Sequence, residues 1–151
     1  MANADIAAVM KEGACVECGA RTADGLACHD LFGRLLAWEQ DDAELASLHY
    51  WNVACYMLQH PSNYTEEGYA MTAGIFREAY DRKWNTSEIL EATRTFIADK
   101  GKFKITNPLP SGERRRLPRE WSMTIEDIYR GGERNAAQNV KVWRSRVRRE
   151  L

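Results

Sequence analysis

The stretch from residue 15 to residue 60 reads CVECGARTADGLACHDLFGRLLAWEQDDAELASLHYWNVACYMLQH, and it contains every cysteine and histidine of the chain. Residues 61–151 contain neither type. Thiolates and imidazoles are the protein groups that hold soft or borderline metal ions such as zinc. This clustering makes a metal-stabilised fold the first expectation from the sequence.

The stretch begins with a knuckle motif, CVECG at residues 15–19. A tight turn lets two thiolates at this spacing reach one tetrahedral ion, and the glycine allows backbone amides to turn toward the sulfurs. A third cysteine and a final histidine complete a candidate set of four. Four protein ligands leave no open position for a substrate, which favours a structural zinc over a catalytic one. The predicted ligands are Cys15, Cys18, Cys28 and His60.

The apolar spacing in this stretch predicts a helical hairpin. Residues 28–40 carry one apolar helical face, and a second helix extends from about residue 44 to about Gln59. The Asp41-Asp42 pair between them suits a helix cap and a first turn, and Pro61 stops the second helix. The hairpin therefore brings the beginning of its first helix close to the end of its second.

This register selects among the candidates for the fourth ligand. Cys28 is expected opposite residues 55–58 and therefore close to His60, whereas His49 is expected roughly 10 Å from the level of Cys28, at about 1.5 Å per residue. Cys55 is near the right level but points roughly 140° away from His60, at about 100° per residue. His60 is thus the preferred fourth ligand, with His49 and Cys55 as alternatives.

The rest of the chain predicts further helices, so we expect an all-α, single-domain bundle over residues 1–151. Knuckle and hairpin occupy 13–60, and two further helices occupy 61–99. An irregular linker with one short helical turn occupies 100–132, and a basic C-terminal helix occupies 133–151. A short helix over 1–12, a strand-like run over 102–105 and an exposed connection over 107–118 are also expected. The predicted buried faces of the last two long helices comprise Ile89, Leu90, Thr93, Phe96, Ile97, Ala136, Val140, Trp143 and Val147.

Charge is divided unevenly along the chain. Residues 1–99 carry 16 acidic and 7 basic side chains, whereas residues 100–151 carry 6 acidic and 14 basic ones. We expect the basic third to fold back onto the acidic body. The alternative is a basic surface for nucleic acid or an acidic partner, although a nucleic-acid-binding domain is usually basic overall. The candidate partner-binding residues of the last helix are Arg144, Arg146, Arg148 and Arg149.

The N-terminal residues and the apolar runs indicate a cytoplasmic protein. No apolar run approaches membrane length, and residues 1–13 lack both the basic region and the apolar stretch of a signal peptide. Without export the four cysteines are expected to be reduced, which favours a metal site over a disulfide framework.

The motifs between residues 15 and 64 resemble those of an uncharacterised bacterial family, a domain of unknown function. Its members carry a CxxCG knuckle, a C-x3-F-x2-LLA-x-E helix and an H-x3-V-x2-Y-x-LQHP segment. Here these elements read CVECG, CHDLFGRLLAWE and HYWNVACYMLQHPSNY. The resemblance implies a small, mostly helical cytoplasmic protein and no particular reaction. Cys55 is not part of the pattern. The positions to which the resemblance points are Cys15, Cys18, Cys28, His49, Tyr56, Gln59 and His60.

The sequence favours a binding role over an enzymatic one. It contains no phosphate-binding glycine loop, no H-E-x-x-H motif and no nucleophile elbow. We expect a zinc-stabilised module that binds another protein in a bacterial multi-protein system. One alternative is a metal-containing enzyme with a pocket around His49 and Tyr56, in which Gln59 and Cys55 are further candidates. The other is a nucleic-acid-associated protein that uses its basic C-terminal third.

Overall fold

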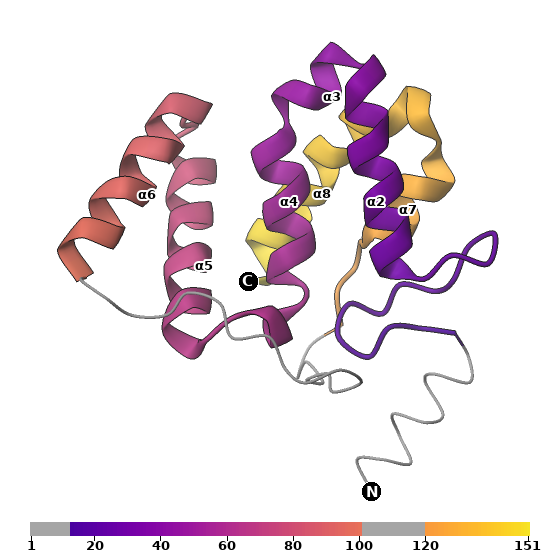
Figure 1. Ribbon diagram of the computed structural model, residues 1–151, viewed down its shortest axis with the longest axis horizontal. Coiled ribbons are helices and arrows are strands. Elements are labelled where there is room, and N and C mark those ends of the chain that lie inside the picture. Colours follow the sequence, from indigo (N-terminus) through magenta and orange to yellow (C-terminus); the bar gives the residue numbers. More distant parts are fainter. Residues whose placement is uncertain (1–12, 101–119) are drawn as a thin grey trace, which may run out of the picture.

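The computed structural model of the protein describes residues 13–100 and 120–151, which form seven α-helices and three short 3-10 turns (Figure 1). Among these residues there is no strand, and two isolated β-bridges stabilise the knuckle segment. The predicted all-α bundle is therefore confirmed. The expectations for 1–12, 102–105 and 107–118 lie outside the described residues. The helices are α2 (Cys28–Trp38), α3 (Ala43–Ser47), α4 (His49–Leu58), α5 (Glu66–Asp81), α6 (Thr86–Lys100), α7 (Ile125–Gly131) and α8 (Ala136–Glu150).

The predicted hairpin is present, but its second helix is interrupted. Asp42 caps α3 by accepting a hydrogen bond from the Leu45 amide at 3.0 Å. The Ser47 hydroxyl then donates to the Glu44 carbonyl at 2.6 Å, and the Leu48 amide turns to the Leu45 carbonyl instead. A side chain that takes a backbone acceptor in this way competes with the helical hydrogen bonds. The chain therefore forms α3 and α4 where one continuous helix was expected.

Helix α6 lies at the outer edge of the molecule, beside α5 (Figure 1). Its start is a reciprocal cap: the Glu88 amide donates to Asn85 at 2.9 Å, and the Asn85 amide donates to Glu88 at 3.2 Å. The predicted buried face is correct for Ile89 but wrong for Leu90 and Ile97, which are 50% and 42% exposed. Since α5 is its principal helical neighbour, only a narrow strip of α6 is covered.

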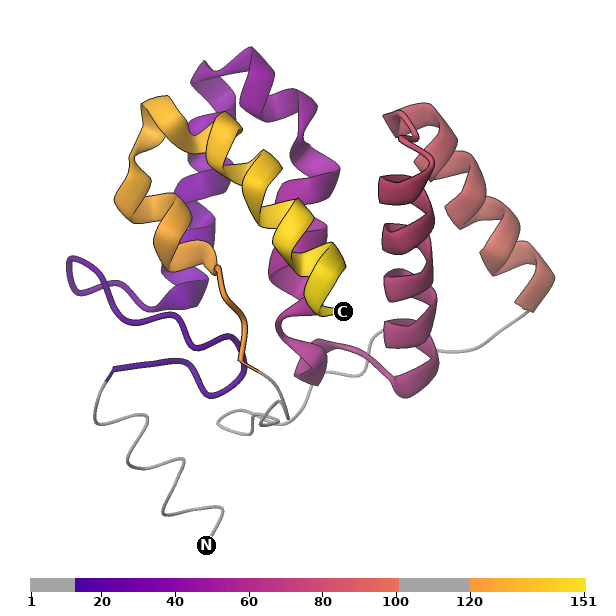
Figure 2. The ribbon, with the colours of Figure 1, turned by 180° about the vertical axis from the view of Figure 1, so that it is seen from behind.

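Helix α8 runs obliquely across α4 on the other side of the hairpin (Figure 2). Val140, Trp143 and Val147 are fully buried, as the spacing predicted, and the Trp143 indole donates to the Met123 carbonyl at 3.1 Å. The basic helix also meets the acidic body, because Lys141 pairs with Glu44 at 2.8 Å on α3. Apolar burial and ion pairs thus join the C-terminal helix to the rest of the bundle.

The described helices share one hydrophobic core, to which α2, α3, α4, α5, α7 and α8 contribute fully buried side chains. None of the helices within residues 13–100 and 120–151 combines the length and the apolar character needed to cross a membrane.

Candidate metal centre

Four ligand atoms converge at the base of the hairpin, and they belong to the residues that the sequence predicted. The thiols of Cys15, Cys18 and Cys28 and a ring nitrogen of His60 all lie within 4.8 Å of one another. The His60 Nε2 atom is 3.5 Å from the Cys28 sulfur and 3.7 Å from the Cys15 sulfur. In a tetrahedral site with metal–sulfur bonds of about 2.3 Å and metal–nitrogen bonds of about 2.05 Å, a sulfur ligand and a nitrogen ligand lie about 3.5–3.6 Å apart. The cluster is therefore close enough to bind one metal ion.

The knuckle positions the first two thiols by a tight backbone turn. Gly19 has a φ of 84° and donates its amide to the Cys15 carbonyl at 2.8 Å. The next amide, that of Ala20, donates to the Cys18 sulfur at 3.3 Å. A positive φ is readily accessible to glycine and strained for most other residues. The sequence-based expectation of a glycine that turns an amide toward a sulfur is thus met.

His60 follows the last turn of α4 and is held in a fixed orientation. Its Nδ1 atom is 2.6 Å from the Tyr56 carbonyl oxygen, and its ring stacks on the Tyr56 ring with centroids 4.1 Å apart. Once the ring is neutral, a proton on Nδ1 that is donated to this carbonyl leaves Nε2 available to a metal ion. Since Nε2 faces the cysteines, the backbone of α4 itself orients the fourth ligand.

The protonation states of the four side chains favour the binding of a cation. Burial lowers the pKa of His60, but its hydrogen bonds with Cys15 and Cys28 outweigh this and raise the pKa to about 10. Hydrogen bonds from Cys18 and Cys28 lower the pKa of Cys15, whereas the bond to Cys15 raises the pKa of Cys18. The cluster thus contains a Cys15 thiolate that accepts hydrogen bonds from its protonated neighbours. A metal ion would replace those protons, which couples its binding to proton release.

Glu17 is a residue of the candidate site that the sequence did not identify. This carboxylate is only 3% exposed, and it accepts hydrogen bonds from both the amide and the hydroxyl of Ser62, each at 2.8 Å. Ser62 lies two residues after His60, so Glu17 joins the knuckle to the turn that carries the fourth ligand. A charged residue is rarely fully buried without a partner. Its position inside the CxxC loop was the only signal in the sequence.

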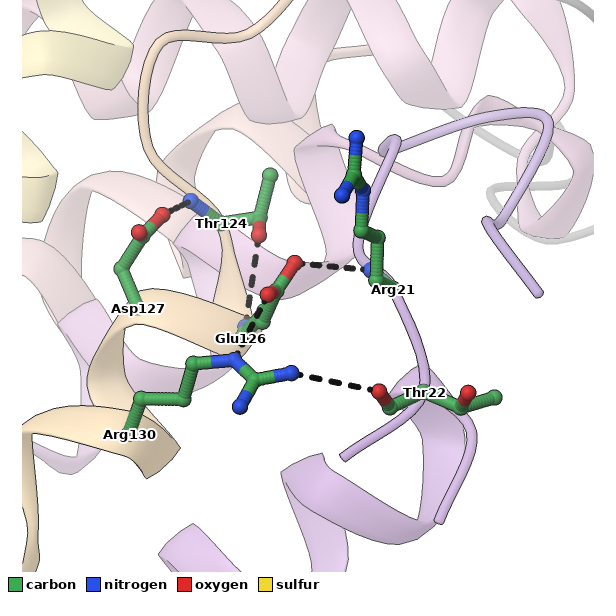
Figure 3. Close-up of polar contacts among 6 residues, drawn as sticks. All are labelled: Arg21, Thr22, Thr124, Glu126, Asp127 and Arg130. Carbon is green, nitrogen blue, oxygen red and sulfur yellow. Dashed lines mark hydrogen bonds and ion pairs between the residues drawn. The ribbon is translucent and has the colours of Figure 1, made fainter. Parts of the chain in front are cut away.

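Helix α7 holds the other side of the knuckle segment through Glu126 (Figure 3). One carboxylate oxygen accepts from the Arg21 amide at 2.8 Å, and the other accepts from Arg130 at 2.7 Å. Arg130 also donates to the Thr22 carbonyl at 3.3 Å. Burial raises the pKa of Glu126, but these bonds outweigh it and lower the pKa. We call this set of contacts the α7 clamp, and no pattern in the sequence indicated it.

The alternative ligands lie elsewhere. His49 contacts Glu39 at 2.8 Å, and its side chain is 60% exposed. Cys55 is fully buried in the core, and burial raises the pKa of its thiol well above the usual value. Gln59 is also buried and donates to the Met123 carbonyl at 2.8 Å. None of these residues is part of the four-residue cluster.

The alternative of one pocket around His49 and Tyr56 is not supported, because the two residues line different cavities. Tyr56 lies beside the cluster, with its hydroxyl 3.7 Å from the Cys28 sulfur, and lines a cavity of about 240 Å³ with His60. His49 lies at a larger cavity between α4, α5 and α6. The two positions are seven residues apart on α4, where a helix has advanced by about 10 Å.

The four candidate arginines of α8 divide into two pairs. Arg148 forms a bidentate ion pair with Asp81, at 2.9 and 2.7 Å. The guanidinium of Arg144 lies 4.9 Å from the centre of the Trp51 ring. Arg146 and Arg149 form no hydrogen bond or ion pair with the part of the chain that the structure describes. Two arginines therefore hold α8 to the body, and two remain available.

This fold and site define a small helical bundle with a Cys3His cluster that can hold a metal ion. The chain belongs to a protein family described as "Family of unknown function (DUF5946)", whose family model matches residues 13–151. The match confirms the resemblance to an uncharacterised family and extends it from the hairpin to the last helix. No curated protein and no solved structure matches the chain.

Proposed function

We propose that the cluster holds one structural zinc ion and that the protein is a binding module for another protein. The observation that carries the proposal is the convergence of four ligand atoms within 4.8 Å from two separate parts of the chain. Three sulfurs and one imidazole nitrogen in a tetrahedral arrangement are typical of structural zinc sites. The ligands of this site are Cys15, Cys18, Cys28 and His60.

A structural role agrees with the way in which the knuckle segment is held. Residues 13–27 contain no helix, and the regular backbone pairing within this segment consists of two isolated β-bridges. Such a segment buries little apolar surface and needs other attachments to stay in one place. The ion would join it to α2 and to the end of α4, while Glu17 and the α7 clamp provide two further attachments. Four protein ligands leave no open coordination position for a substrate.

The interaction role rests on the outward face of α8. Val142 is one of the three exposed large apolar side chains of the described residues. Arg146 and Arg149 follow it on α8 by four and seven positions, and neither forms a hydrogen bond or ion pair with the described part of the chain. An apolar side chain flanked by free arginines suits the acidic surface of a protein partner. The four free cysteines agree with a reducing, cytoplasmic setting in a bacterial cell.

Metal content tests the zinc proposal directly. Native mass spectrometry of the purified protein should show one tightly bound zinc ion. Cys18→Ser and His60→Ala should lose it and unfold at lower temperature, because each removes one of four ligands. Cys55→Ala and His49→Asn are the matched controls and should keep a full complement of zinc. Zinc loss in the His49 variant together with zinc retention in the His60 variant would contradict the ligand set.

The interaction role is tested by charge reversal on α8. A tagged version of the protein is expressed in the organism that encodes it. Its partners are cross-linked to it in these cells and identified by mass spectrometry. The double variant Arg146→Glu, Arg149→Glu should lose a partner that the control variant Lys83→Glu, Arg94→Glu keeps, because only the first pair lies on the proposed surface. An identical set of partners for both variants would refute this surface.

A further inference from the structure

A second cavity, of about 530 Å³, lies between α4, α5 and α6 and shares no residue with the metal ligands. Val53 and Ala54 of α4 and Leu90 of α6 give it apolar walls. Five hydroxyl-bearing residues, Ser47, Tyr50, Tyr64, Thr72 and Thr86, also line it. Apolar walls with a few polar groups are the usual composition of a small-molecule site.

The hydroxyl of Tyr50 is the unexplained group at this cavity. It is buried and has no hydrogen-bond partner among the described residues. Buried hydroxyls are nearly always hydrogen-bonded, and an unpaired one destabilises the folded protein. Burial raises the pKa of Tyr50 and also that of Tyr64, so both phenols remain protonated donors at neutral pH. A ligand that brings a hydrogen-bond acceptor to Tyr50 would satisfy this group.

The size of the cavity distinguishes between two kinds of occupant. A helix with side chains is about 10–12 Å across, so about 530 Å³ holds roughly one turn of it. Small-molecule sites typically have volumes of about 300–1,000 Å³, and the cavity falls within this range. The walls contain no arginine or lysine, and their one histidine, His49, already contacts the Glu39 carboxylate at 2.8 Å. A buried carboxylate would lack a counter-ion there, which is costly, so a neutral acceptor is favoured over an anion.

From these observations we propose that the cavity between α4, α5 and α6 binds a neutral, largely apolar small molecule whose carbonyl-type oxygen accepts a hydrogen bond from Tyr50. Leu90, which is half exposed at the edge of the cavity, becomes covered when the ligand is present. This site is independent of the zinc proposal, because its residues are separate from the ligand cluster. It also assigns a role to α6, which the metal centre does not use.

Benzophenone is a suitable probe, because it is neutral, carries one carbonyl and cross-links to nearby C–H groups under ultraviolet light. Its matched control is 1,1-diphenylethylene, which replaces the carbonyl oxygen by a methylene group. Diphenylacetate serves as the anionic control. Binding to the full-length, zinc-replete protein is measured by saturation-transfer NMR, and the cross-linked residues are identified by mass spectrometry.

We expect saturable binding of benzophenone with cross-links in residues 46–54 or 86–90, and about tenfold weaker binding of 1,1-diphenylethylene. Tyr50→Phe should abolish the difference between the two probes without lowering the stability of the free protein. Leu90→Trp should block binding, whereas Ile97→Trp, another exposed position on α6, should not. Equal affinities of the two probes for the unmodified protein, stronger binding of diphenylacetate, cross-links outside the cavity, or no saturable binding would overturn the proposal.

Discussion

Replacing Glu17 tests whether a buried carboxylate holds the knuckle onto the turn that follows His60. Its two hydrogen bonds to Ser62 are charge-assisted, and such bonds contribute about 1.5–3 kcal/mol each. Glu17→Ala removes both and leaves the Ser62 amide unpaired, so we expect a loss of about 3–6 kcal/mol. Glu17→Gln can accept from the amide and donate to the hydroxyl. Two neutral bonds then replace two charged ones, at a cost of about 2 kcal/mol.

The measurement is urea denaturation followed by tryptophan fluorescence, with the free zinc concentration fixed because bound metal contributes to stability. Zinc affinity is compared in parallel by competition with a chromophoric chelator. All variants should bind one zinc ion, and the affinity should fall from the unmodified protein to Glu17→Gln to Glu17→Ala. Glu91→Gln, an exposed position on α6, is the control. A free energy of unfolding within about 0.5 kcal/mol of the unmodified protein for Glu17→Ala would refute the reasoning, since surface substitutions produce changes of this size.

Three further outcomes are expected. Trp143→Ala should lower the free energy of unfolding by about 3–5 kcal/mol in urea denaturation, because it empties a fully buried site under α8. Glu126→Gln should destabilise the protein at neutral pH. Because the folded-state pKa of this carboxyl is lowered, the difference from the unmodified protein should be complete above about pH 4.5 and vanish as the pH falls through the folded-state value. Fluorescence anisotropy should show no retention of DNA or RNA at physiological salt, because two of the four α8 arginines are engaged within the molecule.

The sequence predicted those features that depend on local spacing. The apolar periodicity of α8 identified the buried residues Val140, Trp143 and Val147. The hairpin register predicted that Cys28 lies close to His60, because the two residues lie at similar distances along the chain from the turn that joins the two helices. The contact between Glu17 and Ser62 spans 45 positions, and that between Arg21 and Glu126 spans 105. No periodic pattern relates such residues, so their pairing depends on the assembled tertiary structure.

Two errors have a similar origin. The exposure of Leu90 and Ile97 reflects how few helices surround α6, which the spacing within α6 cannot reveal. The division of the second hairpin helix depends on the Ser47 hydroxyl, which can either point to solvent or take the Glu44 carbonyl.

The knuckle also sets an order in which the protein can assemble during its synthesis. All four candidate ligands have been made once the ribosome has added residue 60, so a zinc site can close before helices α5 to α8 have been made. The α7 clamp needs Glu126 and Arg130, which are made after residue 60. The N-terminal hairpin would therefore be fastened first and would then offer the backbone of Arg21 and Thr22 as a finished docking surface for the C-terminal third.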